Sequence, residues 1–150
     1  MPPPDSSDVD NALVAKLAAD ATLAALMPGG VWIDEGPAGL TQLVIVSLVD
    51  EADAPIFEGR GAEDALYLVV ARELSTVAVK NSKAAAARID ALLDPQPPAA
   101  RATLAVAGYG LLVMRRQSRV RMTEVDEIDS SIRWQHRGGR YQVMVAPIGT

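Results

Sequence analysis

The fold of this chain rests on the run ALYLVVARELS (residues 65–75) and the alanine-rich segment NSKAAAARIDALL (residues 81–93) that follows it. In the first run, which predicts a strand, Leu66, Leu68 and Val70 lie on one face and Tyr67, Val69 and Ala71 on the other. The second run places a buried stripe at helical spacing, and its polar residues are expected to face water. The stripe is Ala85, Ile89, Leu92 and Leu93, and the polar residues are Lys83, Arg88 and Asp90.

The segments before residue 65 predict a second helix and two strands. Apolar residues recur at helical spacing over residues 9–26, which predicts one amphipathic helix closed by Pro28 and two glycines. Residues 31–33 predict a short strand, and the continuous apolar run 43–49 predicts a buried strand. Residues 50–61 are polar enough to predict a long loop, which carries Phe57 and Glu58.

The segments after residue 93 predict an antiparallel group of strands. Residues 111–122 alternate, so Arg115, Arg119 and Arg121 are expected to share the outer face of a half-buried strand. Residues 132–136 and 140–146 are expected to pair as a hairpin across a two-residue Gly138-Gly139 loop. The series predicts an α+β fold, an antiparallel or mixed sheet with two helices packed on one face. We expect a flexible arm at residues 1–8 and one domain over residues 9–150.

The composition excludes several classes of function. The chain has no cysteine and one histidine, which removes disulfides and thiolate chemistry and makes a zinc site improbable. The net charge of −5 argues against general binding to DNA. No apolar run approaches the roughly 18 residues of a membrane span. Residues 1–100 carry 15 acidic and 6 basic side chains, whereas residues 101–150 carry 8 arginines and 4 acidic side chains. Such opposite charges on one molecule favour head-to-tail association.

No catalytic, cofactor-binding or metal site is predicted. His136 has no serine or aspartate that identifies itself as a catalytic partner, so we interpret it as a surface residue of a strand. The carboxylates of Glu124, Asp126, Glu127 and Asp129 are hard-cation ligands in type, but they lack the spacing and glycine of an EF-hand. We interpret these carboxylates as a solvated connection between strands.

The arginine-rich strand is the strongest local charge signal. Its side chains suit a phosphate backbone, an acidic patch on a neighbouring subunit, or a solvated face that protects a sheet edge. The acidic first two-thirds of the chain favours the neighbouring subunit. The candidate residues for a subunit interface are Phe57, Glu58, Arg115, Arg119, Arg121, Glu124 and Asp126.

Taken in order, these segments resemble the tail terminator (tail completion) proteins of long-tailed bacteriophages and phage-like particles. The resemblance runs from about residue 9 to residue 147. It rests on the opening helix with Pro28-Gly29-Gly30-Val31-Trp32, the strand 42–46, the strand and helix over 65–93, and the closing segment 136–145. It contains no invariant chemical motif, and the loop at 50–61 is longer than that family pattern has.

The resemblance implies a hexameric ring that caps the tail tube, stops its growth and presents a surface for joining to the head. It implies partners in the tail tube protein and in a head-completion or connector protein, and passage of genomic DNA through the lumen without sequence readout. It implies a virion location, with assembly in the host cytoplasm, and no catalysis or cofactor. Two alternatives remain, another neck component such as a head-closure or connector subunit, and an α+β dimer that binds a small molecule.

Overall fold

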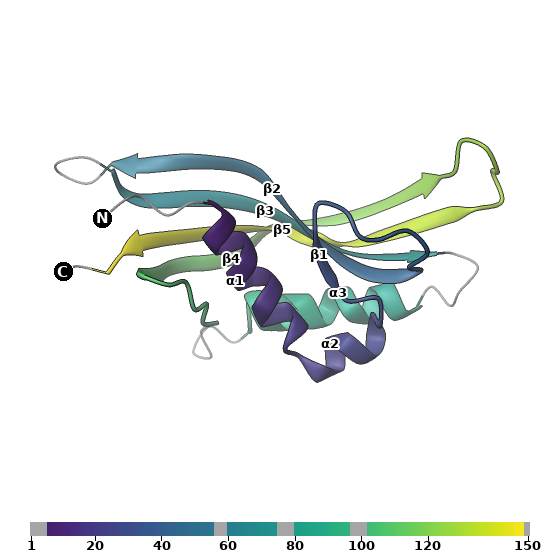
Figure 1. Ribbon diagram of the computed structural model, residues 1–150, viewed down its shortest axis with the longest axis horizontal. Coiled ribbons are helices and arrows are strands. Elements are labelled where there is room, and N and C mark those ends of the chain that lie inside the picture. The colour runs from purple at the N-terminus through teal and green to yellow at the C-terminus, as the bar shows by residue number, and fades with distance from the viewer. Residues whose placement is uncertain (1–5, 56–59, 75–79, 97–101, 149–150) are drawn as a thin grey trace.

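Three helices lie on one face of a five-stranded sheet in the computed structural model, which describes residues 6–55, 60–74, 80–96 and 102–148 (Figure 1). The strand order is β1-β2-β3-β5-β4, with β1 parallel to β2 and the other pairs antiparallel. This confirms the predicted α+β fold with a mixed sheet. The elements are α1 (Ser6–Ala18), α2 (Ala21–Leu26), β1 (Val31–Ile33), β2 (Gln42–Pro55), β3 (Arg60–Leu74), α3 (Lys80–Leu93), β4 (Tyr109–Val125) and β5 (Arg133–Pro147).

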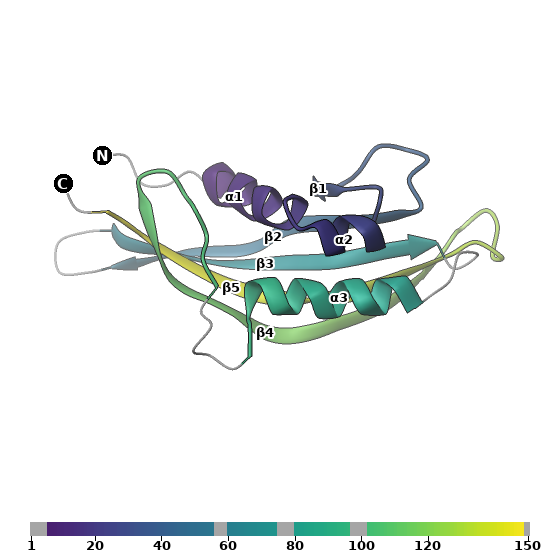
Figure 2. The ribbon, with the colours of Figure 1, turned by 90° about the horizontal axis from the view of Figure 1, so that it is seen from below.

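The core lies between the helices and one face of the sheet, called here the helix-bearing face; Figure 2 shows the helices against it. Strand side chains that point to this face are largely apolar and fully buried, as period-two patterning requires. The helices contribute Val9, Leu13, Leu17, Leu23, Ala85, Ile89 and Leu93, and the strands contribute Val44, Val46, Tyr67, Val69, Ala71, Tyr141, Val143 and Val145. The opposite, helix-free face carries a smaller cluster built on Leu43, Ile45 and Val70.

The predicted helix over residues 9–26 is two helices, and the first begins earlier, at Ser6. Asp20 ends the single-helix pattern because its extended backbone and its carboxylate form the N-cap of α2. Its Oδ2 accepts a hydrogen bond from the backbone N–H of Leu23 at 2.9 Å. Arg88 of α3 also donates to this carboxylate, from Nε at 2.8 Å. The break therefore fixes the direction of α2 against α3.

The predicted loop over residues 50–61 is wrong for most of its length. Residues 50–55 continue β2 and residues 60–61 begin β3, so the two strands form a long hairpin. These residues have low intrinsic β-propensity, but backbone pairing with β3 overrides it. The strand was predicted only as far as its apolar run, and β2 continues past a register shift between Leu48 and Asp50. Phe57 and Glu58 lie outside the described residues.

The predicted hairpin loop at Gly138-Gly139 is also wrong, because β5 runs through both glycines without a turn. A Cβ atom on Gly138 would lie 1.9 Å from the carbonyl oxygen of Val69, and one on Gly139 would lie 2.9 Å from that of Ser118. The glycines are therefore explained by close approach of neighbouring strands. The turn between β4 and β5 lies earlier, at residues 126–132.

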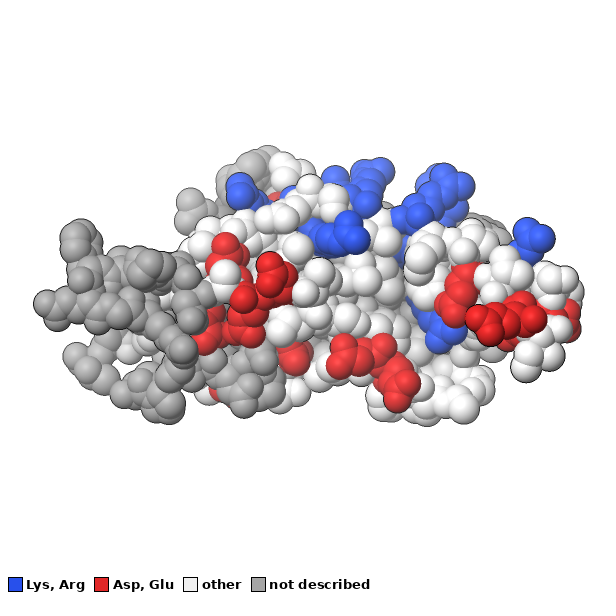
Figure 3. Space-filling view, turned by 90° about the horizontal axis from the view of Figure 1, so that it is seen from above, with Lys and Arg blue, Asp and Glu red and all other residues white. Residues whose placement is uncertain are grey.

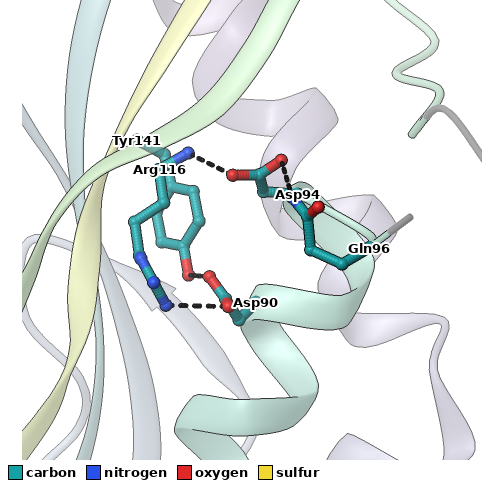
Figure 4. A network of polar contacts seen from close by, with 5 residues as sticks. All are labelled: Asp90, Asp94, Gln96, Arg116 and Tyr141. Atoms are coloured by element: carbon teal, nitrogen blue, oxygen red, sulfur yellow. Dashed lines mark hydrogen bonds and ion pairs between the residues drawn. The ribbon is translucent and has the colours of Figure 1, made fainter. Parts of the chain in front are cut away.

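A polar network fastens the C-terminal end of α3 to β4 and β5 (Figure 4). Asp90 accepts hydrogen bonds from the Tyr141 hydroxyl at 2.9 Å and from Arg116 Nη1 at 2.7 Å. Burial, followed by the charge of Asp90, raises the pKa of Tyr141. The prediction that Arg88 and Asp90 face water is wrong, because each is half-buried in a contact between elements; Lys83 is exposed, as predicted.

Candidate subunit interface at the outer edge of the sheet

Strand β4 forms an outer edge of the sheet: β5 lies on one side of it, and no described strand pairs with the other. An edge strand presents unpaired backbone groups and is a natural place for another chain to bind. Arg115, Arg119 and Arg121 are exposed on β4, as the alternating pattern predicted. The edge is therefore both open and basic.

The three arginines do not share one face, so that part of the prediction is wrong. Arg115 is paired with Gln142, whereas Arg119 is paired with Gly139 and Arg121 with Arg137. Partners three or five residues apart on β5 point to opposite sides, so Arg115 lies on the helix-free face and the other two on the helix-bearing face. The cause is a register shift between Arg116 and Ser118. A one-residue bulge reverses every later side chain.

The first half of the β4 edge is partly covered. The backbone N–H of Arg116, which points away from β5, donates to Asp94 Oδ2 at 3.0 Å (Figure 4). Asp94 and Pro95, with Ala102, line a hollow of about 450 Å³ against residues 111–115. The segment of β4 after Arg116 is the more open part of the edge.

Glu124 does not stand alone as a solvated carboxylate. On the helix-free face its Oε2 lies 3.0 Å from His136 Nε2 and 3.8 Å from Arg72 Nη2. The Arg72 guanidinium also lies 4.1 Å from the centre of the Trp134 ring, a cation–π contact. The His136 side chain is only 12% exposed, so the prediction of a surface strand residue is right about the strand and wrong about exposure. The cluster links side chains of β3, β4 and β5 on the helix-free face.

Asp126 and Asp129 build the turn of this hairpin. Asp126 Oδ1 accepts hydrogen bonds from the backbone N–H groups of Ile128 at 2.8 Å and Asp129 at 3.0 Å. Asp129 accepts from the Ser131 hydroxyl at 2.6 Å, and this bond lowers the pKa of Asp129. Aspartate side chains that bond backbone N–H groups shortly after them stabilise tight turns. Within the described ranges, no three histidine or acidic side chains are grouped to hold a metal ion.

Acidic and basic groups are separated on the surface. Figure 3 shows the helix-free face, with basic side chains gathered along one long edge and acidic ones toward the opposite edge and at the hairpin end. At the opposite edge, β1 pairs only with residues 44–46 of β2, so Asp50 and Glu51 are exposed beyond it. The sequence placed those two residues in the predicted loop over residues 50–61, because the extension of β2 was not recognised. No described helix is long and apolar enough to cross a membrane.

Comparison with known proteins finds similarity in structure. No protein-family model matches the chain, and no curated protein sequence is similar to it. One chain in the solved structure "Virion of native gene transfer agent (GTA) particle" superposes with a TM-score of 0.56 and is 25% identical in sequence. The match covers 93% of this chain and 96% of that chain, so the likeness extends over nearly the full length of both.

Proposed function

We propose that this chain is a structural protein of a phage-like virion. The observation that carries the proposal is the likeness to a chain of a gene transfer agent virion over nearly the full length of both chains. The absence of a recognisable catalytic constellation in the sequence agrees with a structural role. We further propose the specific role that the sequence resemblance implies, a ring that caps the tail tube, ends its growth and offers the surface that joins the head.

The open edges of the sheet support assembly into a ring. Arg119 and Arg121 lie on the helix-bearing face of β4. Glu51 pairs with Ala65, which pairs with Val143, so it lies on the same face near the other edge. A head-to-tail contact between these two surfaces joins opposite charges, and a closing rotation makes such contacts into a ring. We expect a homo-hexamer that binds the tube protein on one side and the head connector on the other, with DNA passing through its lumen.

A head-closure or connector subunit remains an alternative, since the solved structure that this chain resembles is a whole particle. The two roles differ in which purified component the ring binds. A terminator binds the ends of tail tubes, whereas a head-closure subunit binds the head connector and leaves free tubes unmodified. Binding to each component separately distinguishes them.

The test is electron microscopy of two kinds of sample. The first is purified tail tubes with and without added protein, and the second is particles assembled in the absence of the protein. We expect six-fold rings at one end of each tube, and tubes of uncontrolled length when the protein is missing. Tubes of normal length and unchanged ends in its absence would contradict the terminator role.

A further inference from the structure

The turn of the β4–β5 hairpin carries an exposed apolar side chain on a fixed support. Ile128 is 99% exposed, the most exposed large apolar residue that the structure describes. It stands on a turn closed by the hydrogen bonds of Asp126 and Asp129 and by a backbone bond from Ile132 N to Asp129 O at 3.0 Å. Figure 1 shows the hairpin projecting past α3 at one end of the long axis. A positioned apolar tip is suited to insertion into a partner.

The hollow beside the first half of β4 is lined mostly by apolar residues. Its walls include Pro95, Ala102, Leu112 and Met114, and Arg115 is one of the residues that line it. Leu112 is 56% exposed, because the register shift between Leu111 and Val113 turns it outward. An apolar cavity of about 150 Å³ is enough to hold benzene, so a hollow of about 450 Å³ accommodates an isoleucine side chain.

We propose that Ile128 of one copy inserts into this hollow on the next copy in the ring. Charge favours a second copy as the occupant: Asp126, Glu127 and Asp129 surround Ile128, and exposed Arg115 borders the hollow. The hollow's own carboxylate, Asp94, is already bonded to the backbone N–H of Arg116. The proposal rests on the proposed function for the ring, and it adds an apolar contact between neighbouring copies.

The contact cannot form within one chain. Leu112 and Val125 both belong to β4 and lie thirteen positions apart. At about 3.3 Å per residue of strand, this separation is roughly 40 Å before the turn begins. Because the tip and the hollow are different surfaces, the contact is head-to-tail and repeats from copy to copy.

The absence of cysteine from the chain makes the proposal testable by cross-linking. We expect the double variant Ile128→Cys with Leu112→Cys to give a ladder of disulfide-linked oligomers on oxidation, because each copy joins two neighbours. Each single variant gives dimers at most. The control pair, Ile128→Cys with Ile33→Cys at the other edge of the sheet, gives no ladder. A folded double variant that stays unlinked overturns the proposal, as does an equal ladder from the control.

A second measurement needs no cysteine. Ile128→Ser is expected to weaken self-association, measured by analytical ultracentrifugation, by about tenfold or more, while Ile148→Ser, with 59% exposure, has little effect. Normal association of Ile128→Ser overturns the inference and leaves the ring proposal intact. If the wild-type chain forms rings and the double cysteine variant gives the ladder, but tail tubes stay uncapped, the terminator role fails and this contact stands.

Discussion

Asp20 shows how one side chain can set the course of the chain. Its carboxylate caps α2 through the Leu23 N–H and accepts hydrogen bonds from Arg88. The Arg88 hydrogen bond is the main reason that the pKa of Asp20 falls from 3.8 to about 2, against the opposing effect of burial. One carboxylate thus ends α1, starts α2 and attaches it to α3.

Replacing Asp20 should separate these contributions. We expect Asp20→Ala to lower the free energy of unfolding by about 1–2 kcal/mol, and Asp20→Asn by less, because asparagine is also a good N-cap. Folding lowers the pKa of Asp20, so the ionised carboxylate stabilises the folded protein. Wild type should therefore have a higher free energy of unfolding than Asp20→Asn above about pH 4, and this difference should be lost as the pH falls from about 4 to about 2. Urea unfolding at pH 7 and pH 2.5 measures both effects. A difference in stability between wild type and Asp20→Asn that is as large at pH 2.5 as at pH 7 would contradict this account.

Gly138 illustrates a residue whose role sequence patterning misassigns. A Gly-Gly pair between two strand-like runs is a common turn signal, but here only the position of β3 explains it. We expect Gly138→Ala to destabilise the protein by about 2 kcal/mol or more, because the added methyl overlaps the Val69 carbonyl. Gly110→Ala is the matched control, since its added Cβ would have its nearest neighbour at 3.9 Å. Equal thermal unfolding of the two variants would refute the close-approach explanation.

At the scale of elements, local patterns were sufficient where one periodicity persisted. The strand at residues 31–33, the strand within β3 and the buried stripe of α3 were all predictable. Sequence patterns gave wrong predictions in two situations. In one a bulge reverses the alternation of side chains along a strand, and in the other residues of low β-propensity are paired in the sheet. The bulge in β4 and the extension of β2 depend on partners distant in sequence, so no window of local sequence contains them.

The attachment of α3 to the sheet depends on Asp90 in addition to apolar packing. We expect Tyr141→Phe to lower stability by about 1 kcal/mol, since it removes one hydrogen bond to a charged acceptor. The loss in the double variant Tyr141→Phe with Asp90→Ala should be smaller than the sum of the single losses, because both changes remove the same contact. Chemical unfolding of all four proteins measures this coupling. Strict additivity would mean that the contact adds nothing to stability.

At the scale of the whole molecule, the charge separation could be predicted from the sequence, but its geometry could not. The counts of acidic and basic residues already indicated two opposite surfaces. The bulges in β4 decide which of its side chains share a face of the sheet. They place Arg115 on one face and Arg119 on the other. The sequence did not predict the tip or the hollow either. In the sequence Ile128 is one apolar residue within a polar connection, and only the structure shows that it lies at the turn of a hairpin.

The same geometry makes a prediction about ring assembly. We expect Arg119→Glu to leave the monomer folded, because the side chain is exposed and contributes little to the core. The variant should form fewer rings and give tails of uncontrolled length or tails not joined to heads. Single exposed pairs contribute only ~0–1 kcal/mol, but a ring repeats the contact at every subunit. The second change Glu51→Lys should restore assembly, since it reverses the acidic partner on the same face.

The dependence on salt and a matched control variant test whether charge pairing joins the subunits of the ring. Added salt should weaken wild-type rings, because exposed charges are largely screened beyond about 10 Å at 0.1 M salt. Lys83→Glu reverses a charge of the same sign on the exposed side of α3 and should assemble normally. If Arg119→Glu also caps tubes normally at physiological salt, charge pairing at the β4 edge is not what joins the subunits. The ring would then depend on apolar contacts such as Ile128, which salt does not screen.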